Sequence, residues 1–222
     1  WDKTKAVIQV WDSLKWIKKL SEQDVKFDMV FLDIPYKTAA VTGGNRGVKY
    51  DLISPQEFQE FLVDLKKVIS EDTPIYHMFS NAPSWWKQME KYNEKLSEAG
   101  FKKIAEGGWQ KLFKNWKPCS NMRGDIMKKE WLNLYNLSWK IEWEVQMEFE
   151  SVRPKTASEK CAKMVQKLVS QSSNVWDMIL DPFAGTGVVW EACLKLLRNS
   201  MLFEMSEERV KNEILPRLKA VV

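Results

Sequence analysis

Histidine and cysteine are scarce in this sequence of 222 residues, which has one histidine and three cysteines. The cysteines, Cys119, Cys161 and Cys193, are odd in number and far apart, which fits neither a disulfide framework nor the spacing of metal ligands. A single histidine, His77, gives no basis for a zinc site. We therefore expect a reducing, intracellular (cytoplasmic) setting, no metal, and a packed position for His77 at the end of a strand.

Long apolar runs are also absent, and none approaches the roughly 18 residues that a membrane-spanning helix needs. The chain begins at Trp1 without a basic-then-apolar leader, so we expect a trimmed natural start and no secretory signal. A hydrophobic fraction of 45% with 29% charged residues is typical of a globular protein. At this length, one domain covering residues 1–222 is expected, with no membrane partner.

Apolar, β-rich runs alternate with helical patterns along most of the chain, beginning with Ala6–Val10, Ser13–Leu20 and Phe27–Leu32. This alternation predicts an α/β fold with a parallel sheet and helices on both faces. Ser54–Glu57 is a capping box and predicts a helix from Pro55 to about Ile69; Thr156–Glu159 is a second one and predicts a helix to about Val169. Further elements are expected at 74–79, 84–99, 101–109, 131–137, 178–180, 187–197, 201–204 and 207–220.

Two stretches lack this pattern and are expected to be long loops, which in a compact domain are usually functional or disordered. The first, at 37–54, contains three glycines and Arg46. The second, at 110–130, holds six basic and two acidic residues, whereas the formal net charge of the whole chain is only +4. Such a segment can contact phosphates, although a solvated loop is the simpler interpretation. Its basic residues are Lys111, Lys114, Lys117, Arg123, Lys128 and Lys129.

A glycine-rich turn, Asp181–Gly187, follows a predicted buried strand and precedes a predicted helix. Gly185 and Gly187 allow a sharp turn and a close approach to a ligand, and the helix N-terminus offers free amide donors. The next strand ends at Glu204, where a carboxylate can accept both hydroxyl groups of a ribose. The pattern predicts a nucleoside cofactor at Asp181, Phe183, Gly185, Thr186, Gly187 and Glu204.

A second motif, Asp33-Ile34-Pro35-Tyr36, follows another apolar strand. An amino group on an aromatic ring is a poor nucleophile because its lone pair is delocalised, and two acceptors that bind its hydrogens localise that lone pair. The Asp33 carboxylate and the Ile34 carbonyl can supply these acceptors. Pro35 restrains the backbone of Ile34, and Tyr36 offers a flat face for a base turned out of its stack. Taken alone, this short match also fits a strand-ending turn.

Together the two motifs resemble the amino-methylating DNA methyltransferases, whose signatures read Asp/Asn/Ser-Pro-Pro-Tyr and Phe-x-Gly-x-Gly. The catalytic motif comes first, as in the circularly ordered β-class. The resemblance implies a Rossmann-like sheet, S-adenosylmethionine (SAM) as cofactor, and DNA as substrate. It further implies cofactor contacts from Asp12 and from Arg153 and Lys155 in Arg153–Thr156, and a Trp-x-Lys strand at Trp109–Lys111 beside the base.

Two departures from the family pattern keep alternatives open. Ile34 replaces the first proline, and the room for a target-recognition region is small, so recognition is expected from the two loops, a homodimer or a partner subunit. Asp33, rather than serine, favours adenine N6 over cytosine N4. For the reaction, the open alternatives are N4-cytosine methylation, RNA methylation, methylation of a protein glutamine, and a non-catalytic subunit that binds nucleic acid. For the biological context, an orphan or phage-type enzyme and a restriction-modification partner both remain open.

Overall fold

The computed structural model describes residues 4–35, 53–80, 86–109, 130–141, 144–149 and 160–220. Strands and helices alternate along this part of the chain, as the sequence predicted. The strands are β1 (Ala6–Val10), β2 (Met29–Leu32), β3 (Ile75–Ser80), β4 (Lys102–Trp109), β5 (Glu130–Asn136), β6 (Met178–Asp181) and β7 (Asn199–Glu204). The helices are α1 (Ser13–Ser21), α2 (Pro55–Leu65), η2 (Lys66–Val68), α3 (Trp86–Glu98), α4 (Ala162–Ser172), α5 (Val188–Lys195), α6 (Glu207–Arg209), η3 (Val210–Ile214) and α7 (Leu215–Lys219).

The strands form one sheet with the order β1-β7-β6-β2-β3-β5-β4. The first five strands in this order run parallel to one another, whereas β5 runs antiparallel to both β3 and β4. The expectation of a parallel sheet is therefore right for five strands and wrong for this edge. Two parallel neighbouring strands must be joined by a crossover connection. Because β5 lies between β3 and β4 and runs antiparallel to both, it can follow β4 without a crossover.

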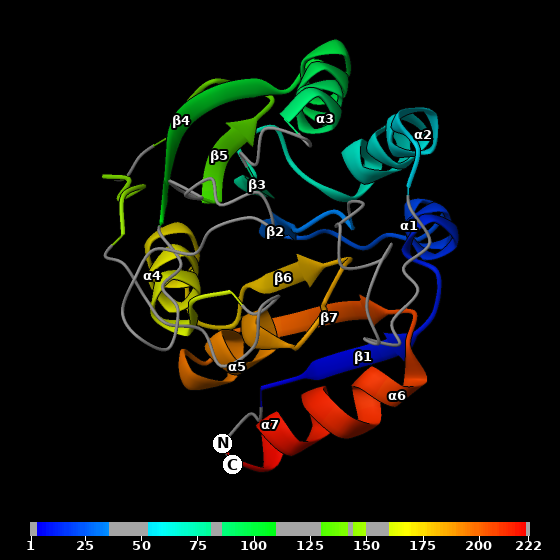
Figure 1. Ribbon diagram of the computed structural model, residues 1–222, viewed down its shortest axis with the longest axis vertical. Coiled ribbons are helices and arrows are strands. Elements are labelled where there is room, and N and C mark those ends of the chain that lie inside the picture. Colours follow the sequence, from blue (N-terminus) through cyan, green and yellow to red (C-terminus); the bar gives the residue numbers. More distant parts are fainter. Residues whose placement is uncertain are drawn as a thin grey trace, which may run out of the picture.

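Helices cover both faces of the sheet, which confirms the predicted layers (Figure 1). On one face, α1, α2 and α3 pack against apolar side chains of the central strands, with Ile17, Phe58 and Leu96 in one buried cluster. On the other face, α4 and α5 contribute Leu168 and Val189 to a second cluster. The helix formed by α6, η3 and α7 closes the β1–β7 edge through a third cluster.

One predicted helix start needs correction, and the last helix contains an irregular turn. The helix expected from Thr156–Glu159 begins instead at Ala162, where the Cys161 sulfur accepts from the Met164 amide at 3.5 Å. The capping box itself lies outside the described residues. At the C-terminal end, the helix widens into the π turn η3 just before Pro216, because a proline nitrogen cannot donate the next backbone hydrogen bond.

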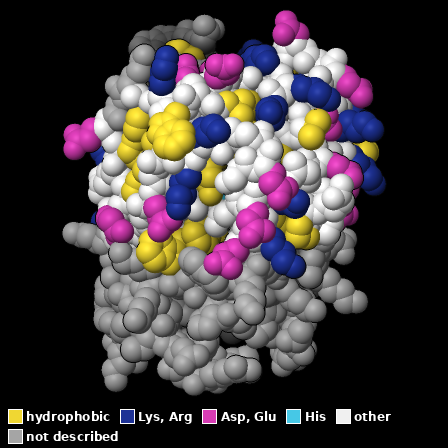
Figure 2. Space-filling model, turned by 90° about the horizontal axis from the view of Figure 1, so that it is seen from above, with side chains coloured by type: hydrophobic (Ala, Val, Ile, Leu, Met, Phe, Trp, Pro, Cys, Tyr) yellow, Lys and Arg dark blue, Asp and Glu magenta, His cyan; other side chains and the backbone are white. Residues whose placement is uncertain are grey.

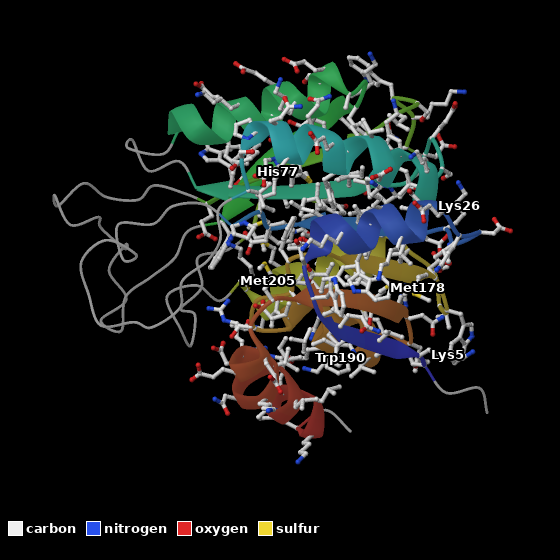
Figure 3. The ribbon with its side chains drawn as sticks, turned by 90° about the vertical axis from the view of Figure 1, so that its right-hand side faces the viewer. Lys5, Lys26, His77, Met178, Trp190 and Met205 are labelled. Carbon is white, nitrogen blue, oxygen red and sulfur yellow. The ribbon has the colours of Figure 1, made fainter. Side chains whose placement is uncertain are left out.

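All parallel strands point the same way, so their carboxyl ends share one edge of the sheet. In Figure 3, Lys5, Lys26 and Met178 lie toward the amino ends of strands, whereas His77 and Met205 lie toward the opposite end. The chain leaves β2 toward one side of the sheet, through α2 to β3, and leaves β6 toward the other side, through α5 to β7. In open α/β sheets, ligands bind at such a switch point, which here lies between β2 and β6.

The surface carries charged groups of both signs. On the face in Figure 2, basic and acidic side chains are interspersed with small groups of hydrophobic ones. Within the described ranges, no helix combines the length and the apolar character that crossing a membrane requires.

Candidate functional site

Four acidic residues lie where parallel strands end. Asp33 follows β2, Asp181 ends β6, Glu204 ends β7, and Asp12 lies two residues after β1. The register pairs Val10 with Glu204, which aligns the ends of β1 and β7. The charges of Asp33 and Glu204 both act on Asp181. The structure thus brings the two sequence motifs together at the switch point of the sheet.

The turn from β6 into α5 is held by backbone hydrogen bonds. The Ala184 amide donates to the Phe203 carbonyl at 2.9 Å, and the Gly187 amide donates to the Ala184 carbonyl at 2.8 Å. Gly185 and Gly187 have φ values of 54° and 75°, which are left-handed conformations that favour glycine. Thr186 between them is buried, and Phe183 packs against Phe61 of α2. The glycines are therefore required by the backbone of this turn.

Replacing Gly187 by alanine is expected to destabilise the fold. A Cβ at this position would lie 2.9 Å from Ile214 Cγ2, whereas a Cβ on Gly185 would meet nothing closer than 3.9 Å. Both variants carry the strain of a positive φ, about 1–3 kcal/mol, and Gly187→Ala adds a clash with η3. Urea unfolding should show a larger loss for Gly187→Ala than for Gly185→Ala. Equal losses would mean that the Ile214 contact relaxes at no cost.

Glu204 is held in place by two backbone amides. Its Oε2 accepts from the Gly185 amide at 3.0 Å, and its Oε1 accepts from the Ser206 amide at 2.9 Å. Its exposed fraction is 7%, and this burial raises the pKa of the carboxyl, while the backbone hydrogen bonds and Arg209 oppose the shift. Each carboxylate oxygen has a second acceptor position. The two amides thus fix a carboxylate that can still bind further hydroxyl groups.

Asp181 is buried more deeply than the other two carboxyl groups. Burial raises its pKa well above the ordinary value, and the charges of Asp33 and Glu204 raise it further, against one hydrogen bond from the Phe183 amide at 3.2 Å. Asp33 is more accessible, with a side chain that is 25% exposed. Asp181 therefore anchors the turn, whereas Asp33 can be reached by a substrate.

Sequence reasoning missed two residues beside Asp33. Lys160, which precedes α4, places its Nζ 3.0 Å from Asp33 Oδ1 and 3.5 Å from Glu130 Oε2. Both Lys160 and Glu130 are buried. Neither belongs to a periodic pattern or to either glycine or proline motif, so only their three-dimensional contact identifies them.

Other predicted residues have additional or different surroundings. Asp12 caps α1, accepting from the Leu14 amide at 2.9 Å, so it has a structural role as well as a place at this edge. Trp109, at the end of β4, is fully buried in the cluster under α4 and does not offer an exposed ring. His77 is buried on β3 with Nδ1 3.0 Å from Asn93 Oδ1, which confirms its packed position, although it lies within the strand and not at its end.

Several predicted residues lie outside the described residues. These are Tyr36, Arg46, Lys111, Lys114, Lys117, Arg123, Lys128, Lys129, Arg153 and Lys155, together with most of both predicted loops. Of the Asp33–Tyr36 motif, the structure places Asp33, the buried Ile34 and the half-buried Pro35 directly after β2.

Comparisons with solved structures agree with this architecture. M1.HpyAVI superposes with a TM-score of 0.70 at 20% sequence identity, covering 96% of this chain and 98% of that one. Its complex with SAM gives the same TM-score at 19% identity and the same coverage. PvuII DNA methyltransferase, which is cytosine-N4-specific, gives 0.67 at 13% identity, covering 94% and 84%. These likenesses establish the fold.

The family assignment comes from the sequence. Among curated proteins, none matches this chain at a significant level. The family model described as DNA methylase, which spans the N6 and N4 amino-methylating enzymes, matches residues 80–215. This match covers more than half of the chain and includes the turn between β6 and α5 as well as Glu204. The protein belongs to the N6/N4 DNA methylase family.

Proposed function

We propose that this protein transfers a methyl group from SAM to the exocyclic N6 amino group of adenine in DNA. The observation that carries the proposal is the placement of Asp33 and the Ile34 carbonyl at the end of β2, next to the Asp181–Gly187 turn and Glu204. An acceptor pair for an amino group thus lies beside a turn suited to a nucleoside. Residues 1–222 act as one domain in this proposal.

The residues at the turn fit SAM in shape and charge. Glu204, held by two backbone amides, suits the two ribose hydroxyl groups, and the left-handed glycines keep side chains away from the ligand. Asp12 is assigned to the adenine end, and Arg153 and Lys155 to the methionine end.

When bound between Glu204 and the Asp181–Gly187 turn, SAM would supply an electrophilic methyl group to the amino nitrogen, and S-adenosylhomocysteine and one proton lost to solvent would be the other products. Asp33 and the Ile34 carbonyl accept the two amino hydrogens and so localise the lone pair. Pro35 keeps Ile34 extended and aims its carbonyl. Tyr36 is assigned to stacking on the flipped base. Orientation in this arrangement provides most of the rate.

The assignment of the target rests on sequence. Asp33, rather than serine, favours adenine within this family. The basic residues of 110–130, with Arg46, are assigned to the DNA phosphates, and a second copy or a partner subunit would complete sequence recognition. Phosphate contacts position a protein without reading sequence, so these lysines alone would give affinity without selectivity.

The product identifies the reaction. Incubation of the protein with methyl-labelled SAM and unmethylated DNA, followed by nucleoside mass spectrometry, should yield N6-methyladenine. RNA and a cytosine-rich DNA lacking adenine serve as matched substrates. N4-methylcytosine would replace the adenine assignment while keeping the chemistry. Absence of product on every polymer, with SAM still bound, would favour a non-catalytic subunit.

A further inference from the structure

Lys160 joins two acidic side chains that come from distant parts of the chain. Asp33 follows β2, Glu130 begins β5, and Lys160 lies two residues before α4. The Lys160 ammonium is 3.0 Å from Asp33 Oδ1 and 3.5 Å from Glu130 Oε2. The exposed fractions of the Lys160 and Glu130 side chains are 9% and 4%. The buried Lys160 ammonium thus contacts two carboxylates, that of Asp33, which is the proposed acceptor of the amino hydrogens, and that of Glu130.

Fold stability gives little reason for such an arrangement. Removing an ammonium and a carboxylate from water is costly, and their attraction rarely exceeds this cost, so well-packed apolar residues would often serve the fold equally well. Buried charges held in a fixed geometry are common where a protein orients a reacting group. Here the group that Lys160 can orient is the Asp33 carboxylate.

The chemistry limits what Lys160 can do. Two neighbouring carboxylates favour the protonated ammonium, which donates hydrogen bonds and accepts none. Lys160 therefore cannot take the proton that a methylated amine releases. It can, however, keep Asp33 ionised and hold one of its oxygens in place. An ionised carboxylate accepts hydrogen bonds from an amino group, whereas a protonated one offers its own donor.

We propose that Lys160 is a positioning residue for Asp33: its ammonium fixes Asp33 Oδ1, and Glu130 in turn fixes the ammonium. This inference rests on the proposed function and adds two residues to it. The pair acts on methyl transfer through the orientation and charge of Asp33, and it has no part in holding SAM. Its loss therefore lowers the rate of the bound complex without lowering cofactor affinity.

The first test measures single-turnover methyl transfer and SAM binding in two variants. Lys160→Met removes the charge at similar length and is expected to lower the rate about 10- to 100-fold, by analogy with groups that orient metal-ligating side chains. SAM affinity should stay within about threefold. Lys160→Arg keeps the positive charge and should recover a large part of the rate. Lys163→Met, at an exposed position on α4, is the matched control.

The second test uses the pH dependence of the single-turnover rate, which a general loss of folding would not shift. Among the described residues, Lys160 before α4 and Asp181 on β6 are the ionisable groups that act on Asp33, and Glu130 on β5 contacts Lys160. Removing the cation in Lys160→Met should move the acidic limb to higher pH. Glu130→Gln removes an opposing negative charge and should move that limb to lower pH.

The outcomes separate this inference from the proposed function. If the unaltered protein methylates DNA and Lys160→Met matches it in rate and pH profile, Lys160 has no positioning role. A reduced rate with an unshifted profile, not recovered by arginine, would assign it to the fold alone. If Lys160→Met does not fold, Glu130→Gln decides: a rate equal to that of the unaltered protein would remove the positioning role of the pair. If the unaltered protein methylates nothing, the proposed function fails before this inference is reached.

Discussion

Replacing Asp33 by alanine is expected to remove methyl transfer and to leave SAM binding in place. The carboxylate is one of the two acceptors assigned to the target amino group, and it lies at the end of β2, whereas Glu204 and the β6–α5 turn are assigned to the cofactor. Removing one preorganised polar group from a reacting centre typically costs about 100- to 1,000-fold in rate. Single-turnover transfer and calorimetric SAM binding measure the two effects separately.

Two further variants make the Asp33 result interpretable. Asp33→Asn keeps the size of the side chain and one acceptor oxygen, so it shows whether charge or shape is lost. Asp28→Ala removes a carboxylate just before the same strand, at the opposite edge, where it accepts from the Met178 amide at 2.7 Å. This control should keep methyl transfer. A fall in SAM affinity for Asp33→Ala, parallel to its fall in rate, would contradict the division of labour between the strand ends.

The sequence predicted the layers and the strand ends well because both depend on local signals. Alternating apolar segments identify strands and helices, and glycine or proline after a strand identifies a turn at the carboxyl edge. The sequence alone therefore assigns Asp33, Asp181 and Glu204 to one edge of the sheet. The capping box at Ser54–Glu57 was also confirmed, since both of its hydrogen bonds are formed.

Features that depend on contacts between distant segments were not predicted. The antiparallel insertion of β5 follows from strand pairing, which residue periodicity does not encode. Lys160 and Glu130 belong neither to the glycine-rich turn nor to the Asp33–Tyr36 motif. The box at Thr156–Glu159 matched a helix-start pattern, but the helix begins at Ala162. A short local pattern specifies a possible start, and tertiary packing selects among the possibilities.

Replacing Glu204 by glutamine is expected to weaken the binding of ribose-containing ligands specifically. The carboxylate offers acceptors on both oxygens, whereas the amide keeps one acceptor oxygen and adds a donor. Losing a hydrogen bond to a charged group costs about 1.5–3 kcal/mol, roughly a 10- to 150-fold loss of affinity. The unaltered protein should prefer adenosine to 2′-deoxyadenosine, and Glu204→Gln should lose this preference. Glu207→Gln, on the exposed surface of α6, is the control.

The pH dependence of adenosine binding gives an independent test of Glu204. Burial raises the pKa of this carboxyl, so protonation occurs at higher pH than for an ordinary glutamate. The ionised form is the one that accepts both hydroxyl groups, and affinity should therefore fall as the pH is lowered through this raised pKa. Glu204→Gln cannot titrate here and should bind with little change over the same range. If both proteins showed the same pH dependence, another group would control binding, and the assignment of the ribose to Glu204 would have to be abandoned.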